Sequence, residues 1–219
     1  MNIKRLQHLA GSLLIVFAVN ASAETPVEVK LIAAIEEDRG WCLDLRGRLG
    51  NAQPVGGLHG HTCDSYAGNG LAIDQAYAME DIQDKNQFRL IGFEDKCMTL
   101  YEPQAGSFIS METCDGRASQ QIVLNESGQI TPTMMPELCL TMSDVVQPGG
   151  GGRPLHIMRD VTFEDCDSDP NELQLWELRT EWTGPQETTA ERPYAFNPNA
   201  PVPGMGAGMG MGAGTGMGN

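Results

Sequence analysis

Two short stretches of the sequence carry side chains that could bind a ligand. In "GWCLDLRG" (40–47), Asp44 stands in an alternation of apolar and acidic residues. In "LHGHTC", His59 and His61 occupy alternate positions, and alternate residues of a strand point to the same face. Asp44 is therefore either the outward polar residue of a strand or a ligand contact. The two imidazoles are ligand contacts, metal ligands together with Asp64 or Asp44, or the solvated side of a strand.

Other reactive arrangements are incomplete. The acidic stretch "EDCDSDPNE" (164–172) spaces its acids like a calcium loop, but Glu172 replaces the required glycine and Leu178 the bidentate glutamate. We interpret it as a solvated turn. The sequence has none of the G-x-S-x-G, H-E-x-x-H or phosphate-loop motifs, and a cysteine bound in a disulfide cannot act as a nucleophile. We therefore expect a protein that is not an enzyme and needs no cofactor or metal.

The beginning of the chain has the order of a secretory signal peptide. Two basic residues precede an apolar run, and an A-S-A sequence ends at Ala23, directly before Glu24. The apolar run is too short to cross a bilayer, so we expect no membrane span. We predict that residues 1–23 are removed and that the protein is secreted or periplasmic. All six cysteines follow this segment, and an even number of cysteines in an exported chain indicates disulfides.

The cysteines divide the chain into three similar units. Unit one, unit two and unit three each begin with a related word (CLDL, CMTL or CLTM) and reach a second cysteine after a turn rich in Gly or Pro. Apolar residues recur at every second position, which indicates strands. A turn between two strands brings their ends together. The turns therefore favour pairing within each unit: Cys42 with Cys63, Cys97 with Cys114, and Cys139 with Cys166.

A glutamine word follows the second cysteine of every unit: "QAY" (75–77), "QIV" (121–123) and "QLW" (174–176). Cysteine-paired units with C-L-x-apolar and Q-x-aromatic words resemble the ricin-B-type β-trefoil, a family of galactose- and xylan-binding lectin modules. The resemblance covers about residues 30–180. It implies an all-β fold with twelve strands in three units about a pseudo-threefold axis. It also implies that Tyr77, Val123 and Trp176 pack in the core, as repeated apolar positions usually do.

In this family each unit can hold one sugar site. The site consists of an acid after the first cysteine, a polar and a planar side chain before the second, and the Asn-Gln pair of the glutamine word. A carboxylate, a ring and an amide together bind the hydroxyls and the C–H face of a neutral sugar. The resemblance implies these ligand-binding residues in unit one, with Asp and His replacing the usual Asn and aromatic residue: Asp44, His59, His61, Asp74 and Gln75.

The other two units lack the acid and the ring. Thr99 and Thr141 stand where unit one has Asp44, and glutamates replace the second histidine. Threonine satisfies a polar outward position, so the strand itself does not require an acid. We therefore predict a single glycan site of modest affinity in unit one, because repeated sites are what give such lectins avidity.

The composition changes after the third unit. We expect a β-trefoil over residues 24–182 and a flexible tail over 183–219, since the tail is rich in Pro, Gly and Met and cannot bury enough apolar surface to fold. Its methionines could dock against a protein partner or bind Cu(I).

The charge and the degenerate units set the expected partners. A formal net charge of −15 opposes binding of nucleic acid or anionic lipid, so the expected partner is a glycan or glycoconjugate. The alternative is a protein-interaction or cell-surface-targeting subunit of a secreted complex or toxin, because trefoils of this type also serve that role and two units have lost the sugar-binding pattern.

Overall fold

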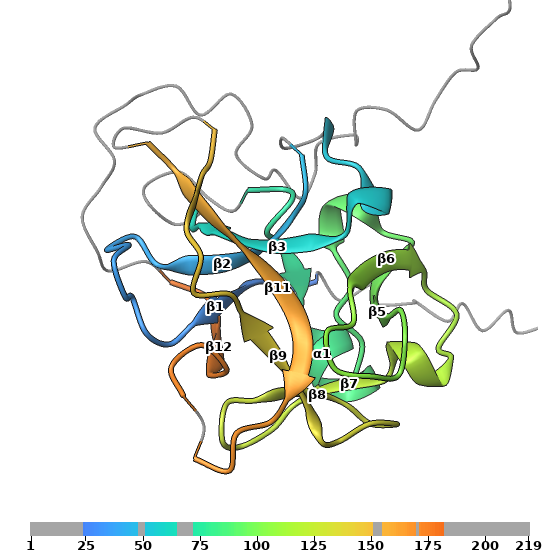
Figure 1. Ribbon diagram of the computed structural model, residues 1–219. Helices are drawn as coiled ribbons and strands as arrows, with labels where there is room; N and C mark the ends of the chain where they lie inside the picture. Colours follow the sequence, from blue (N-terminus) through green and yellow to red (C-terminus); the bar gives the residue numbers. More distant parts are fainter. Residues whose placement is uncertain (1–23, 48–50, 65–71, 151–154, 170, 182–219) are drawn as a thin grey trace, which may run out of the picture.

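The computed structural model describes residues 24–47, 51–64, 72–150, 155–169 and 171–181. The predicted signal peptide and the predicted tail lie outside these residues. Three units follow one another along the chain and pack around a shared core, as Figure 1 shows. Within the described ranges, no helix is long and apolar enough to cross a membrane.

The strands divide among the three units in chain order. Unit one holds β1 (Pro26–Leu31), β2 (Trp41–Leu45), β3 (Leu58–Thr62) and β4 (Tyr77–Ala78). Unit two holds β5 (Lys96–Leu100), β6 (Ile109–Thr113) and β7 (Ile122–Leu124), and isolated bridges at Leu90 and Arg89 take the place of its first strand. Unit three holds β8 (Ile130–Pro132), β9 (Leu138–Met142), β10 (Gln147–Pro148), β11 (Ile157–Asp165) and β12 (Trp176–Arg179). The predicted all-β trefoil of three cysteine-paired repeats is confirmed.

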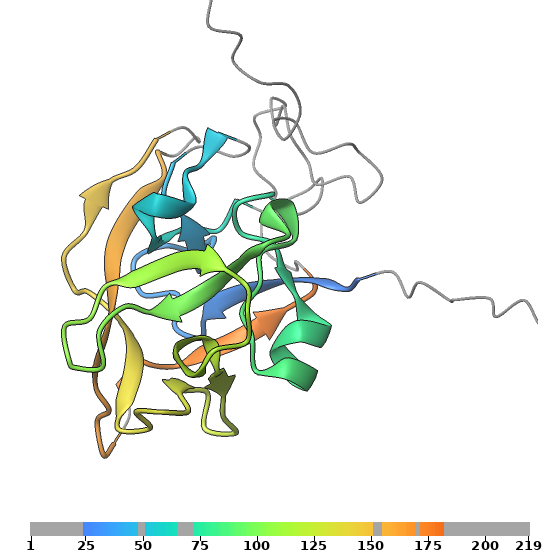
Figure 2. The same ribbon diagram turned by 90° about the vertical axis from the view of Figure 1, so that its right-hand side faces the viewer.

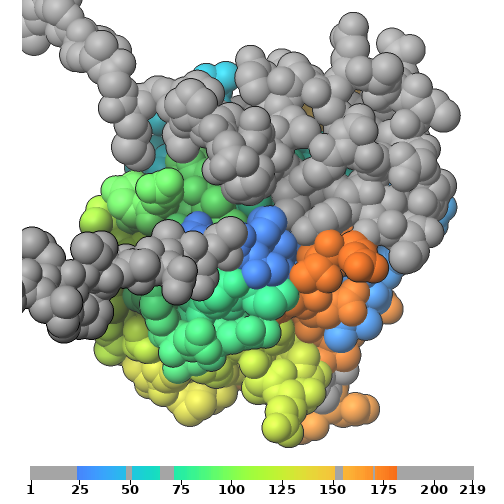
Figure 3. Space-filling model, turned by 180° about the vertical axis from the view of Figure 1, so that it is seen from behind, coloured from blue at the N-terminus to red at the C-terminus, as the bar shows by residue number. Residues whose placement is uncertain are grey.

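Short helices occupy some of the connections. They are α1 (Met79–Lys85) and the 3-10 turns η2 (Pro54–Gly56), η3 (Ile91–Phe93) and η4 (Ala118–Gln120). The periodicity did not predict α1, which is capped at its C-terminus by Asn86 in the left-handed conformation (φ 55°). Figure 3 shows α1 on the surface beside the start of β1 and the end of β12. The Thr25 N–H donates to the carboxylate of Glu80 on α1, which holds the helix against the beginning of β1.

The three cysteine-paired hairpins share one register. Cys42 lies opposite His61 in β2–β3, and the first cysteines of the β5–β6 and β9–β11 hairpins lie opposite Glu112 and Glu164. The cysteine Cα atoms are 4.9, 5.1 and 4.9 Å apart, a spacing that suits a disulfide across neighbouring strands. Each disulfide therefore closes its own unit: Cys42–Cys63, Cys97–Cys114 and Cys139–Cys166.

One long strand connects unit three to unit one. The C-terminal part of β11 pairs with β9, and its N-terminal part pairs with β3, where Met158 lies opposite His61 and Asp160 opposite His59. At the other end of the chain, β12 pairs with β1, so that Leu31 lies opposite Trp176. These contacts between units close the structure around its core.

The aromatic and apolar residues of the glutamine words anchor the core. Tyr77 and Trp176 are buried, and the Trp176 indole N–H donates to the carbonyl of Leu140 at 2.9 Å. In unit two the expectation was wrong by one residue: Ile122 is fully buried and Val123 only half-buried. The sequence has two adjacent glutamines there, and only the fold shows that the first of them is the structural one.

Candidate functional site

The β2–β3 hairpin places the acid and both imidazoles of unit one on one face. Asp44 and His59 are direct cross-strand partners, and His61 follows on β3. Leu43 and Leu45 point to the opposite side, where they belong to the hydrophobic core. The alternation predicted from "CLDL" is therefore present, with apolar residues on the core side and Asp44 on the other.

Gln75 fixes the Asp44 carboxylate. The Gln75 side chain is fully buried, and its Nε2 donates to Asp44 Oδ2 at 2.6 Å and to the carbonyl of Thr62 at 3.2 Å. Its Oε1 accepts the N–H of Asp64 at 2.8 Å. The glutamine thus ties β2 to the end of β3 and holds the carboxylate in one orientation.

The same bonds recur in the other units. Gln120 Nε2 donates to the hydroxyl of Thr99 at 3.3 Å and to the carbonyl of Thr113 at 2.8 Å. Gln174 Nε2 donates to the hydroxyl of Thr141 and to the carbonyl of Asp165, both at 3.0 Å. The glutamine bond is therefore part of the trefoil framework. Unit one differs only in offering it a carboxylate instead of a hydroxyl.

Three imidazoles gather beside this carboxylate. His59 Nε2 lies 3.8 Å from Asp44 Oδ1, and His61 Nδ1 lies 3.5 Å from Asp44 Oδ2. His61 Nδ1 is also 2.9 Å from the carbonyl of Thr62, so this nitrogen carries the proton and donates it there. The buried ring of His156, just before β11, meets the ring of His61 edge-on with centroids 5.2 Å apart. All three histidines of the described ranges thus lie together.

His156 was missed because no pattern in the sequence connects it to unit one. It belongs to unit three, and it reaches this site only because β11 crosses over to pair with β3. The residues around it, "LHIM", have the pattern of an ordinary strand and do not indicate a binding role.

The site is more enclosed than the outward position of Asp44 suggested. Asp44 is only 5% exposed, and His59 and Asp74 are buried as well. The most open member is His61, whose side chain is 13% exposed. The N-terminal part of β11 pairs along the free edge of β3, and the Gln75 side chain lies against Asp44 on β2. Asp44 therefore lies on the face of its strand away from the core, as the alternation predicts, but it is shielded from solvent.

Burial changes the acidity of these groups. Burial raises the pKa of Asp44 to about 7, against the opposing effects of His61 and the Gln75 hydrogen bond. Burial, reinforced by the positive charge of Arg46, lowers the pKa of His59 to about 4. Burial and then the charges of Asp44 and Asp74 raise the pKa of the Tyr77 hydroxyl, so both carboxyl groups lie near that ring. The pKa values of Asp44 and His59 therefore differ from those of the same side chains on a solvated strand.

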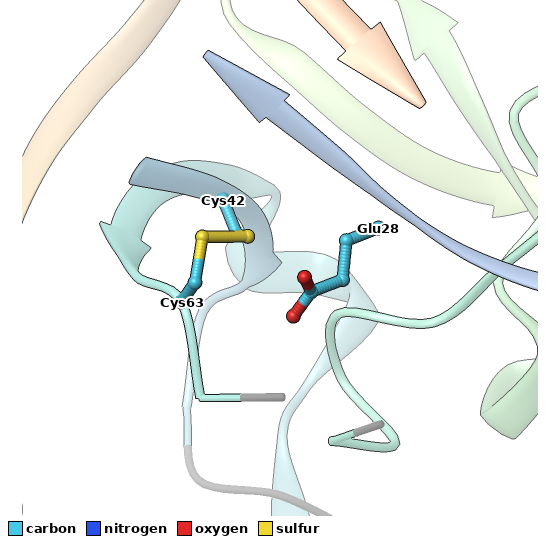
Figure 4. A group of neighbouring side chains, drawn as sticks. All are labelled: Glu28, Cys42 and Cys63. Carbon is cyan, nitrogen blue, oxygen red and sulfur yellow. A yellow bond between two sulfur atoms is a disulfide. The ribbon is translucent and has the colours of Figure 1, made fainter. Parts of the chain in front are cut away.

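The metal alternative finds no preformed site here. In the described part of the chain, the ligand atoms that lie within 4.8 Å of one another belong to Glu28, Cys42 and Cys63, and this group does not include the imidazoles. Figure 4 shows the Glu28 carboxylate pointing toward the two sulfur atoms. Those sulfurs form a disulfide, so the group offers no thiolate ligand to a metal ion. The Glu28 carboxylate already accepts a hydrogen bond from the positively charged Arg179 at 2.7 Å.

Comparison with known proteins gives the fold. No protein-family model and no curated protein sequence matches the chain. An earthworm lectin C-terminal domain, solved as a mutant with 6'-sialyllactose, is 12% identical, with a TM-score of 0.50 over 72% of this chain and 99% of that one. The Vibrio vulnificus hemolysin/cytolysin β-trefoil lectin, solved with N-acetyl-D-lactosamine, is 17% identical, with a TM-score of 0.48 over 74% and 98%.

A longer lectin chain matches in part. An agglutinin from Abrus precatorius is 16% identical, with a TM-score of 0.46 over 73% of this chain, which spans 48% of the agglutinin chain. The strand order, the three disulfide-closed hairpins and the likeness to the earthworm domain agree with one another. This chain has the β-trefoil fold of the ricin-B-type lectins.

Proposed function

We propose that this protein binds carbohydrate without catalysing a reaction, and that its ligand contacts lie in unit one. The contact set is that predicted from the sequence: Asp44, His59, His61, Asp74 and Gln75. We propose further that the protein works outside the cytoplasm, because three disulfides persist in an oxidising compartment.

The observation that carries this proposal is the Asp44–Gln75 bond. Thr99 and Thr141 satisfy the equivalent glutamines with a neutral hydroxyl. An acid at the same buried position is costly, because the ionised carboxylate loses its hydration. Residues that weaken a fold in this way are concentrated at functional sites. Asp44 is therefore better explained by a ligand than by the framework.

The chemistry of the set fits a hydroxyl-rich ligand. A carboxylate can accept two hydroxyl hydrogen bonds, the Gln75 amide fixes its direction, and an imidazole can both donate and accept. We therefore propose that this set binds a ligand and does not cleave a bond.

Burial determines how such a ligand would enter. His61 is the most open member, so we place the entry at its ring. A sugar hydroxyl reaches Asp44 only after a local rearrangement of the hairpin cover. Binding that waits for a rearrangement is slow, so we expect a lower association rate constant than at an open site.

The decisive experiment is a glycan array with three proteins. Wild type should bind a defined set of glycans, and Asp44→Thr, which keeps the glutamine bond seen in the other units, should lose those glycans that are bound through unit one. Thr141→Ser keeps the Gln174 bond in unit three and should bind like wild type. Equal binding by wild type and Asp44→Thr would remove unit one from the proposal.

A second candidate is a protein-interaction or cell-surface-targeting subunit. The observation in its favour is the enclosure of the site, since four of its five residues are buried. On this reading the cluster around Asp44 is a remnant, and a protein partner contacts another surface. The same array decides between the two functions, because wild type that binds no glycan at all would favour the interaction role.

A further inference from the structure

The tip of the β5–β6 hairpin, residues 101–108, carries an exposed aromatic pair. Tyr101 is 62% exposed and Phe108 is 40% exposed. Their ring centroids are 6.5 Å apart and the planes are inclined by 76°, an edge-to-face contact. Contact between an exposed aromatic ring and water is unfavourable, and a ligand that stacks on the ring removes part of this contact. The pair is therefore a candidate binding surface in a unit that lacks the predicted sugar contacts.

The fold holds this tip in place. The N–H of Glu102 donates to the hydroxyl of Ser107 at 2.9 Å, which closes the turn. The N–H of Gly106 donates to the carbonyl of Phe163 at 2.9 Å and to Glu164 Oε2 at 3.1 Å. Figure 2 shows the tip of this green hairpin reaching the orange β11. The two rings are thus presented on a bonded hairpin.

Phe108 rests on a glycine that leaves room for it. A Cβ at Gly57 would lie 2.2 Å from Phe108 Cζ and 2.3 Å from the carbonyl oxygen of Ile109. Gly57 also has a φ of +68°, which side chains rarely adopt. One part of the Phe108 ring therefore packs against bare backbone while the rest stays open to solvent.

A polar pair accompanies the rings. Gln104 Nε2 donates to Glu102 Oε2 at 2.8 Å, and both residues are exposed, so the pair's remaining donor and acceptor atoms are available to hydroxyl groups. A planar ring, a carboxylate and an amide are the groups that a neutral sugar requires. The carboxylates of Glu102 and Glu164 and the net charge of −15 disfavour an anionic ligand.

We infer that the 101–108 tip is a second contact site for a neutral sugar ring, with Tyr101 as the stacking surface and the Glu102–Gln104 pair as its hydroxyl contacts. This site shares its ligand class with the proposed function and none of its residues. It is open where the unit one site is enclosed. Two sites on one chain would raise the avidity for a glycan that presents several sugars.

The test is a nuclear magnetic resonance titration of isotope-labelled full-length protein with methyl β-D-galactopyranoside and, separately, xylobiose, each to millimolar concentration. With at least one probe, the backbone amide signals of Tyr101, Gln104 and Phe108 should shift in wild type and equally in Asp44→Thr. Tyr101→Ala should weaken that binding at least tenfold, a loss of about 1.4 kcal/mol. Tyr101→Phe keeps the ring and should retain it.

Four outcomes would overturn the inference. They are the absence of shifts at the tip with both probes, shifts confined to β2 and β3, unchanged binding in Tyr101→Ala, and tip shifts that depend on protein concentration without sugar, which would mean that a second copy covers the rings. Leu155→Ala, at another exposed apolar residue, is the control and should bind like wild type. Shifts confined to β2 and β3 would contradict the tip site and leave the proposed unit one site standing. Binding at the tip, together with unchanged glycan-array binding in Asp44→Thr, would remove only the unit one site.

Discussion

Gln75 donates to Asp44 at 2.6 Å in the same place where Gln120 and Gln174 donate to Thr99 and Thr141. The fold thus contains two natural examples of the same bond without the acid. They show what unit one would look like if Asp44 served the framework alone, and they define the substitution that separates ligand binding from stability.

Replacing the acid should make the protein more stable. The pKa of Asp44 is raised from 3.8 to about 7 in the folded protein, so the folded state holds this proton more tightly than the unfolded state. Stability from this group is present below about pH 4 and is lost as the pH rises through 7. Asp44→Thr removes that loss, and we expect it to gain roughly 1–3 kcal/mol at pH 8. Urea unfolding at pH 4.5, 6 and 8 measures the gain.

The control for this prediction is Thr99→Ser, which keeps the glutamine bond in unit two and should leave the pH dependence unchanged. An Asp44→Thr protein that is less stable than wild type at pH 8 would show that the carboxylate serves the framework after all.

His59 should have the opposite pH dependence. Its pKa is lowered from 6.5 to about 4, so the unfolded chain binds the proton more readily. The stability it contributes is present above about pH 6.5 and is lost toward pH 4, by up to ~1.4 kcal/mol per pH unit. In wild type this loss is offset by Asp44, so His59→Asn should improve stability at pH 5 relative to pH 7. A proton resonance titration of the imidazole that gives an ordinary pKa near 6.5 would contradict the enclosed position of His59.

The two adjacent glutamines of unit two should differ sharply. Gln120 is fully buried and bonds to Thr99, to the carbonyl of Thr113 and to the N–H of Asp115. Gln120→Ala leaves these groups unsatisfied and opens a cavity, so we expect a loss of about 2–4 kcal/mol in the free energy of unfolding. Gln121→Ala is the matched control on the partly exposed neighbour, with an expected change within about 0.5 kcal/mol. Similar losses for both would mean that the unit two register is misassigned.

Each disulfide should contribute a similar amount to stability. The loop closed by Cys97–Cys114 spans 17 residues and that closed by Cys139–Cys166 spans 27. Closing loops of this length constrains the unfolded chain by about 3 kcal/mol, with only a weak dependence on length. Replacing either pair with alanines should therefore lower the free energy of unfolding by about that amount in chemical denaturation. A loss several times larger for one pair would point to a packing role beyond the cross-link.

Local patterns in the sequence were sufficient for the strands, the turns and the cysteine pairing, and the resemblance to the ricin-B-type lectins implied the trefoil. Alternation of apolar residues marked the strands, Gly and Pro marked the turns, and cysteines on both sides of each turn indicated pairing within units. These signals act over a few residues, so they can be read without the fold. The same locality explains the error at Val123, because two neighbouring glutamines fit the repeat equally well until η4 places Gln120 inside.

Only the tertiary structure decided the character of the site. The sequence determined that Asp44, His59 and His61 share one hairpin, since their spacing from the cysteines sets the register. It did not determine that β11 runs past its own unit to pair with β3 and brings His156 to His61, or that Asp44 is buried. Pairing between strands more than 90 residues apart, as His61 with Met158, depends on how whole units pack. No local pattern records the burial that results, and burial is what raises the pKa of Asp44 and lowers that of His59.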